Sequence, residues 1–165
     1  MPLVLYNTYE GQACSVARAL EIIGERWTIL ILRDAFLGVR RFDDFQRSLG
    51  VARNVLNARL QRLVEAGVLE RQLYQERPAR YEYRLTQKGR DLWPALFSLM
   101  QWGDRHLPGD TGPPLAVEHR GCGGVVDDRR LCRACGARVE LRDVRAVPGP
   151  GADAGVRDRL VATAP

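Results

Sequence analysis

Apolar residues recur at helical spacing through the first part of the chain. Val16, Leu20 and Ile23 share one face of a predicted helix, and Ser15 is placed to cap its start. A second helix is predicted over residues 27–36. It is apolar nearly all round, so we expect it to form the buried centre of a domain.

Two more predicted helices are joined by a glycine turn. Residues 42–49 form a short helix with three inward-facing residues, Phe42, Phe45 and Leu49. Gly50 makes the turn, and residues 52–66 form a longer, amphipathic helix. Its apolar stripe consists of Leu56, Leu60, Leu63 and Val64, and its polar face consists of Asn54, Asn57, Ala58 and Gln61.

A β-hairpin pattern follows the longer helix. Strands are predicted over residues 68–74 and 80–85, with an exposed tip between them. Thr86 is placed to cap a long last helix that reaches about Leu107, and Pro94 is expected to kink this helix. The predicted fold class is therefore mainly α (α+β), a winged helix-turn-helix with a two-stranded wing and a long C-terminal helix suited to dimerisation.

Composition divides the chain into three predicted parts. Residues 1–108 hold the helical unit, and the Pro/Gly-rich stretch 107–114 reads as a linker. Residues 115–145 carry three of the four cysteines and are predicted to form a small zinc-ribbon-like β segment. The stretch 148–151 is Pro-Gly-Pro-Gly, so we expect residues 146–165 to be a disordered tail.

Basic charge is concentrated in one stretch of the chain. The net charge is +5, whereas twelve basic and six acidic residues between Arg40 and Arg90 give that stretch a net charge of +6. Such a stretch suits a polyanionic partner. An arginine-rich, solvated surface explains the composition equally well.

The sequence also argues against two classes of protein. The apolar run 29–32 is too short to cross a bilayer, and no signal-peptide pattern is seen, so we expect a cytoplasmic protein without membrane contact. With two histidines, no Ser/His/Asp arrangement and no phosphate-binding loop, the chain is not expected to be an enzyme.

A helix-turn-helix followed by a basic hairpin is typical of proteins that bind double-stranded DNA. Arg53 can pair with guanine, and Asn54 or Asn57 with adenine, in the major groove. Arg77 and Arg80 on the hairpin can reach phosphates or a narrow minor groove. The further candidates for DNA contacts are Arg40, Arg41, Arg47 and Arg62.

A second function is compatible with the same elements. Winged helices also bind proteins, so the alternative is a protein–protein interaction module joined to a structural zinc ribbon. Single side chains have ordinary explanations as well, since Asn57 can be a solvated helix residue and Arg62 can pair with surface acids. Strong salt dependence of DNA binding separates the two functions.

Taken in order, the motifs of residues 13–107 resemble those of the HxlR-type transcriptional regulators. The matching stretches are 14–17, 23–27, 30–33, 41–42, 45, 54–56, 59–60, 63, 65–67, 81–89 and 102–103. The resemblance implies a MarR-like homodimer on a palindromic operator, with two recognition helices in major grooves roughly 34 Å apart. The family often has Ser where this chain has Ala52, so a helix cap worth about 1 kcal/mol is missing.

The last predicted helix carries more apolar surface than one face needs to cover a small domain. The residues concerned are Leu92, Trp93, Leu96, Phe97, Leu99, Met100 and Trp102. Pairing of this helix and of the apolar segment 3–6 with a second copy would bury both, which predicts a homodimer. The alternative is that the helix folds back on its own core.

Cys14 lies at the start of the first helix, where the positive end of the helix dipole favours a reactive thiol. In several members of the HxlR-type group a cysteine at this place senses redox state or electrophiles, so the resemblance implies a candidate redox sensor. The alternative is a small apolar residue packed at a dimer interface. The sequence names no small-molecule effector.

Two matched turns in the C-terminal segment have the spacing of metal ligands. His119 and Cys122 form the first pair, Cys132 and Cys135 form the second, and a glycine follows each pair. A Cys3His set is typical of structural zinc, which would supply folding energy that so short a segment lacks. Short strands are expected at 125–126 and 139–141. The alternatives are free thiols in a disordered tail or a reversible Cys132–Cys135 disulfide.

Overall fold

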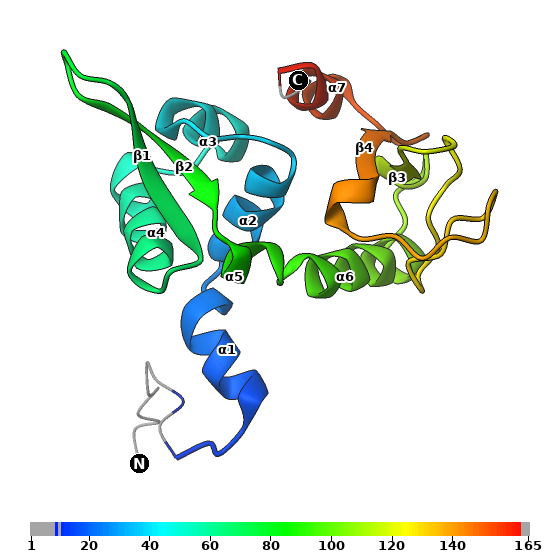
Figure 1. The fold of residues 1–165 in the computed structure, drawn as a ribbon, viewed down its shortest axis with the longest axis horizontal. Coiled ribbons are helices and arrows are strands. Elements are labelled where there is room, and N and C mark those ends of the chain that lie inside the picture. The colour runs from blue at the N-terminus through cyan, green and yellow to red at the C-terminus, as the bar shows by residue number, and fades with distance from the viewer. Residues whose placement is uncertain (1–8, 10, 163–165) are drawn as a thin grey trace.

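The computed structural model describes residue 9 and residues 11–162, and it confirms the winged helix-turn-helix class (Figure 1). The N-terminal elements are α1 (Ser15–Ile23), α2 (Thr28–Phe36), α3 (Phe42–Leu49), α4 (Arg53–Glu65), β1 (Leu69–Gln75) and β2 (Arg80–Leu85). These bounds lie within two residues of those predicted. At α1 the N-cap residue is Cys14, so Ser15 is the first helical residue and not the cap. Within the described ranges, no helix is long and apolar enough to cross a membrane.

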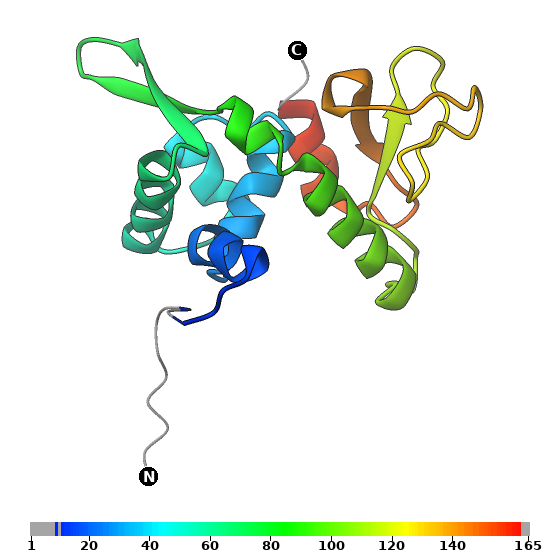
Figure 2. The same cartoon turned by 60° about the horizontal axis from the view of Figure 1, so that its bottom comes forward.

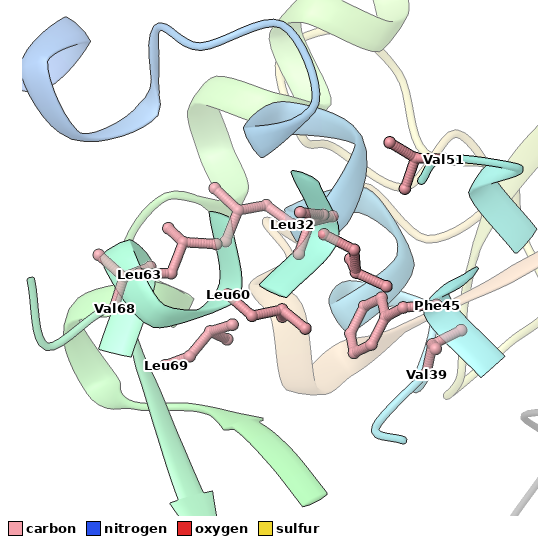
Figure 3. Packing of buried hydrophobic residues seen from close by; sticks show 10 residues of the cluster. Leu32, Val39, Phe45, Val51, Leu60, Leu63, Val68 and Leu69 are labelled. Atoms are coloured by element: carbon pink, nitrogen blue, oxygen red, sulfur yellow. The ribbon is translucent and has the colours of Figure 1, made fainter. Parts of the chain in front are cut away.

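Helix α2 is the centre of the first hydrophobic core. Ile31 and Leu32 are fully buried, and α2 contacts both α3 and α4. Figure 3 shows Leu32, Phe45 and Leu60 gathered between these helices. Of the three predicted inward residues of α3, Phe45 alone is fully buried, whereas Phe42 and Leu49 pack at the edge of the core. Each fully buried side chain of this size contributes about 1.5–3 kcal/mol.

The turn between α3 and α4 depends on a left-handed residue. Gly50 has φ 63°, and its amide donates to the Gln46 carbonyl at 2.9 Å, which closes α3. Ala52 then takes the extended N-cap conformation of α4 without a side-chain hydrogen bond. The structure therefore confirms that α4 lacks a side-chain cap, as inferred from Ala52.

The wing is a two-stranded antiparallel hairpin with an isolated β-bridge at its base. β1 and β2 pair antiparallel from Leu69 opposite Leu85, with an irregularity between Leu73 and Gln75. Arg41 forms an isolated bridge with Glu82, beside a 2.7 Å hydrogen bond from the Tyr83 amide to the Arg40 carbonyl. These contacts join the α2–α3 connection to the base of the wing.

The prediction of one kinked last helix is wrong. The chain instead forms a short α5 (Gln87–Arg90) and a separate α6 (Trp93–His106). Thr86 does act as a cap, but for α5, where its hydroxyl accepts from the Gly89 amide at 3.1 Å. Pro94 falls in the first turn of α6, where its missing N–H removes no helical hydrogen bond.

The C-terminal segment is built on a strand pair that was not predicted. β3 (Leu115–His119) pairs antiparallel with β4 (Val144–Pro148), and a 3-10 turn, η1 (Leu141–Asp143), precedes β4. The expected strands at 125–126 and 139–141 are wrong. Residues 125–126 form only isolated bridges, and residue 141 begins η1.

The expectation that residues 146–165 form a disordered tail is also wrong for its described part. β4 runs to Pro148, and the Gly149 and Gly151 amides donate to the carbonyls of Pro114 and Pro113. The Pro/Gly stretch thus continues the pairing with the linker. A further helix, α7 (Ala154–Ala162), follows and buries Val156. Residues 163–165 and the apolar segment 3–6 lie outside the described residues.

A second hydrophobic core joins the C-terminal segment to α6. It consists of Trp93, Phe97, Val126, Cys132, Val139 and Val144. The segment accordingly lies beside α6 in both views (Figure 1, Figure 2). Part of the apolar surface of α6 that we assigned to a second copy is therefore covered by the chain itself.

The junction between the wing and α5 leaves no room for a side chain at Gly89. A Cβ there would overlap the Val68 carbonyl oxygen and crowd the Leu85 side chain. We expect Gly89→Ala to lower the free energy of unfolding by about 1–3 kcal/mol in urea denaturation. Gln87→Ala, an exposed change in the same helix, should stay within about 0.5 kcal/mol. Equal effects of the two changes would contradict this packing.

Candidate nucleic-acid interface and metal centre

The outer face of α4 is polar and uncovered. Its exposed residues are Arg53, Asn54, Asn57, Ala58, Gln61, Arg62 and Glu65, whereas Leu56, Leu60 and Leu63 are buried against the core. The two asparagine side chains form no hydrogen bond with other described residues. Figure 1 shows α4 at one edge of the molecule, with the β1–β2 hairpin projecting beyond it. The Asn54 and Asn57 amides of this face are therefore free to meet a partner, whereas the Gln61 amide donates to Glu65 at 2.9 Å.

Arg53 is held in place by α3. Its Nη1 donates to Asp43 Oδ1 at 3.1 Å and to Gln46 Oε1 at 2.8 Å, and its guanidinium lies 4.6 Å from the Phe42 ring centroid. The side chain is still 65% exposed. The guanidinium of Arg53 is thus already oriented. To contact a base, it would exchange the Asp43 carboxylate for an acceptor on the base edge. Sequence reasoning missed Asp43 and Gln46, although an acid and an amide three residues apart share one helix face.

Arg62 lies on a different side of α4 from Arg53. They are nine residues apart, which places them on roughly opposite sides of the helix axis. Arg62 Nη2 donates to the Glu21 carbonyl of α1 at 3.3 Å, and the neighbouring Arg59 pairs with Glu25 at 2.9 Å. Both arginines line a cavity of about 430 Å³ between α1, α2 and α4. The structure therefore does not group Arg62 with the other predicted DNA contacts.

The remaining predicted arginines divide into paired and unpaired side chains. Arg40, Arg77 and Arg80 are exposed and form no ion pair within the described part of the chain. Arg41 lies 3.6 Å from Glu82 and 4.6 Å from the Tyr74 ring centroid, and Arg47 pairs with Asp44 at 2.9 Å. The unpaired arginines of the wing and its base are those best placed to donate hydrogen bonds to phosphates.

One further arginine of the wing was missed by sequence reasoning. The Arg71 guanidinium lies 3.5 Å from the Tyr81 ring centroid on the opposite strand. Alternation of side chains along two paired strands could have predicted this cross-strand contact.

The four predicted metal ligands come together at one point. The ligand atoms of His119, Cys122, Cys132 and Cys135 all lie within 4.8 Å of one another. Cys122 Sγ is 3.4 Å from both His119 Nδ1 and Cys132 Sγ, and Cys135 Sγ is 3.4 Å from His119 Nδ1. Sulfur ligands on a tetrahedral zinc ion lie ~3.8 Å apart. The donor set and its spacing therefore fit a tetrahedral ion.

Backbone geometry supports a thiolate at Cys132. Gly123 and Gly136, which follow the two turns, have φ 73° and 72°, so the turns close through left-handed residues. The amides of Cys135 and Ala134, acting against desolvation, lower the pKa of the Cys132 thiol to about 6. At Gly124 a Cβ would lie 2.5 Å from the Cys132 sulfur, so a side chain there would displace the ligand.

Cys14 is remote from this cluster. It is exposed at the start of α1, and the other three cysteines belong to the candidate metal cluster. A disulfide between Cys14 and a second cysteine within one chain would therefore have to take a ligand from the cluster.

These elements define a helix-turn-helix protein of the winged, MarR-like class. The profile of the HxlR-like helix-turn-helix family matches residues 22–111, and the chain belongs to that family. Its relatives are transcriptional regulators. Rv3095 of Mycobacterium tuberculosis, an HTH-type transcriptional regulator, is 51% identical over 147 residues, which are 89% of this chain and 92% of the relative.

Solved structures show the same likeness at two different lengths. The candidate transcription factor PA1607 is 40% identical with a TM-score of 0.66, and the match covers 82% of this chain and 94% of PA1607. The redox regulator HypR in its reduced form is 29% identical with a TM-score of 0.53, and the match covers 57% of this chain and 96% of HypR. The match to Rv3095 is longer than the helical unit of residues 1–108, so it includes part of the C-terminal segment.

The cluster can be tested with cobalt as a spectroscopic probe. We expect one Co²⁺ per chain, with intense thiolate-to-metal absorption and the visible bands of tetrahedral coordination. Cys132→Ser should abolish the tetrahedral spectrum, because the buried central ligand is lost. Cys14→Ser, the matched control, should leave the spectrum unchanged. Retention of the full spectrum by Cys132→Ser would contradict the ligand set.

Proposed function

We propose that this transcriptional regulator binds a palindromic operator as a homodimer and reads base sequence with α4. The observation that carries the proposal is the uncovered polar face of α4 beside unpaired arginines of the wing. An amphipathic helix whose apolar stripe is used inside its own domain can place its outer face in a major groove.

The contacts divide by role. Arg53, Asn54 and Asn57 are the proposed base readers, because they lie on the exposed arc of α4 and carry the donors and acceptors that base edges match. Arg40, Arg77 and Arg80 are the proposed phosphate contacts. Arg41 and Arg47 can contribute after exchanging their present carboxylate partners for phosphate. Arg62 is assigned to the α1–α4 contact.

The remaining apolar surface of α6 supports a homodimer. Leu99 and Trp102 are 53% and 54% exposed, and three residues apart they share one face of the helix. Trp93 and Phe97 face the C-terminal segment on another side. We assign the Leu99–Trp102 face to a second copy, since a two-fold pairing would bury these side chains and set the spacing of two α4 helices.

Zinc and Cys14 complete the proposal. The Cys3His cluster would hold zinc as a structural ion, because four protein ligands leave no open position for chemistry. A redox response is assigned to Cys14 because its thiol is exposed at a helix start, and because a relative of known structure is a redox regulator.

DNA recognition can be tested by two arginine variants and a charge-matched control. Arg53→Ala should reduce discrimination between operator and random duplex by about 1–3 kcal/mol. Arg80→Ala should weaken binding to both duplexes alike and lower the salt slope by about 1. Arg142→Ala, an exposed change in the C-terminal segment, should alter neither. Fluorescence anisotropy at several salt concentrations measures all three.

Two outcomes would contradict the assignment. Equal losses on operator and random duplex for Arg53→Ala would remove its reading role. Absence of DNA binding by the unaltered protein at low salt would favour a protein-binding module instead.

The dimer can be tested by two leucines of equal exposure. Leu99→Glu should raise the dimer dissociation constant at least ~100-fold, because each dimer would bury unpaired carboxylates. Leu73→Glu on the wing, where the leucine is 50% exposed, should leave the dimer intact. Light scattering across a dilution series gives the mass of each species. A dimeric Leu99→Glu protein would move the interface elsewhere.

A further inference from the structure

The apolar surface of α6 is divided into three faces, of which two are covered and one is open. Leu92 and Leu96 pack on the first core, around α2 and α4. Trp93 and Phe97 are 6% and 3% exposed and belong to the second core, with Met100 packed at its edge. Leu99 and Trp102 stay open. The C-terminal segment thus occupies a face of α6 that would otherwise be an exposed aromatic surface.

The metal cluster and this second core share a residue. Cys132 is 1% exposed and is both a member of the core around Trp93 and Phe97 and one of the four ligands. Val126 forms an isolated bridge with Cys132, so a second core residue is fixed through the same ligand. An interaction that fixes the position of Cys132 therefore also fixes the part of the segment that covers Trp93 and Phe97 of α6.

Polar contacts between the segment and α6 surround this core. Arg105 of α6 pairs with Asp128 at 2.5 Å, and the Arg130 guanidinium lies 5.9 Å from the Trp93 ring centroid. Arg130 in turn pairs with Glu140 at 3.2 Å. The Arg105–Asp128 pair is exposed, so it contributes little by itself.

Little else orders the stretch between β3 and β4. Residues 120–140 contain isolated bridges and turns but no strand ladder or helix among the described elements. Few buried side chains are available there, and loop residues lose substantial conformational entropy on ordering. A metal ion that joins residues 119 and 122 to residues 132 and 135 supplies the constraint that the core alone lacks.

We infer that metal bound by His119, Cys122, Cys132 and Cys135 clamps residues 115–148 onto α6, so that coverage of Trp93 and Phe97 depends on the metal. The inference rests on the proposed zinc site and extends it from a local fold to an interaction surface. With metal, the Leu99–Trp102 face alone is left open on α6. Without metal, the aromatic face also opens, and α6 can pair through surfaces that the clamp excludes.

Hydrogen exchange of the full chain tests this inference. Zinc-loaded protein, protein stripped by a chelator and stripped protein reloaded with Zn²⁺ are compared by mass spectrometry, with metal content measured in each. We expect amides of residues 93–100 and 126–144 to exchange at least about tenfold faster after stripping, and reloading to restore them. Amides of α2 to α4 should exchange at unchanged rates, which shows that the winged domain stays folded.

Variants remove the dependence on a chelator. Cys122→Ser/Cys135→Ser should reproduce the stripped pattern, whereas Cys14→Ser should match the zinc-loaded protein. Unchanged protection over 93–100 in metal-free protein would overturn the inference, and so would faster exchange spread equally over α2 to α4. Failure to bind zinc would overturn both the clamp and the structural ion. DNA binding, measured separately, reports on the proposed regulator whatever the clamp does.

Discussion

The packing of α4 on α2 is the interaction on which the remaining architecture depends. Leu56, Leu60 and Leu63 are fully buried, and this fixes both the position of α4 and the direction of its polar face. The Gly50 turn sets the angle between α3 and α4, and Arg53 ties the start of α4 back to α3. Because the apolar stripe is used internally, the asparagines on the outer side remain available. Stability and the proposed recognition of DNA thus use opposite faces of one helix.

Helix α6 extends this division of surfaces to the level of assembly. It packs on the winged domain, receives the C-terminal segment through Trp93 and Phe97, and leaves a third, exposed face that we propose pairs with a second copy. The proposed metal clamp on the same helix would place a metal-dependent contact next to the proposed dimer surface. The long matches to Rv3095 and PA1607 and the shorter match to HypR show that relatives occur at both lengths.

Sequence patterns predicted the features that depend on local periodicity. The spacing of Leu56, Leu60 and Leu63 located α4, and the two ligand turns located the metal cluster, because both signals lie within a few residues. The features missed depend on contacts between distant segments. Residues 149–151, which we expected to be disordered, are ordered by hydrogen bonds from the Gly149 and Gly151 amides to the linker. The covering of Trp93 and Phe97 by Val126, Val139 and Val144 could not be read from the amphipathicity of α6 alone.

The central claim is that two copies of the exposed α4 face read one operator. Selection of bound duplexes from a random DNA pool tests it most directly, because no operator has to be assumed. The account predicts enrichment of an inverted repeat whose half-sites lie about 34 Å apart, one helical turn or a multiple of it. Recovery of unrelated duplexes, or of a single unrepeated half-site, would contradict it.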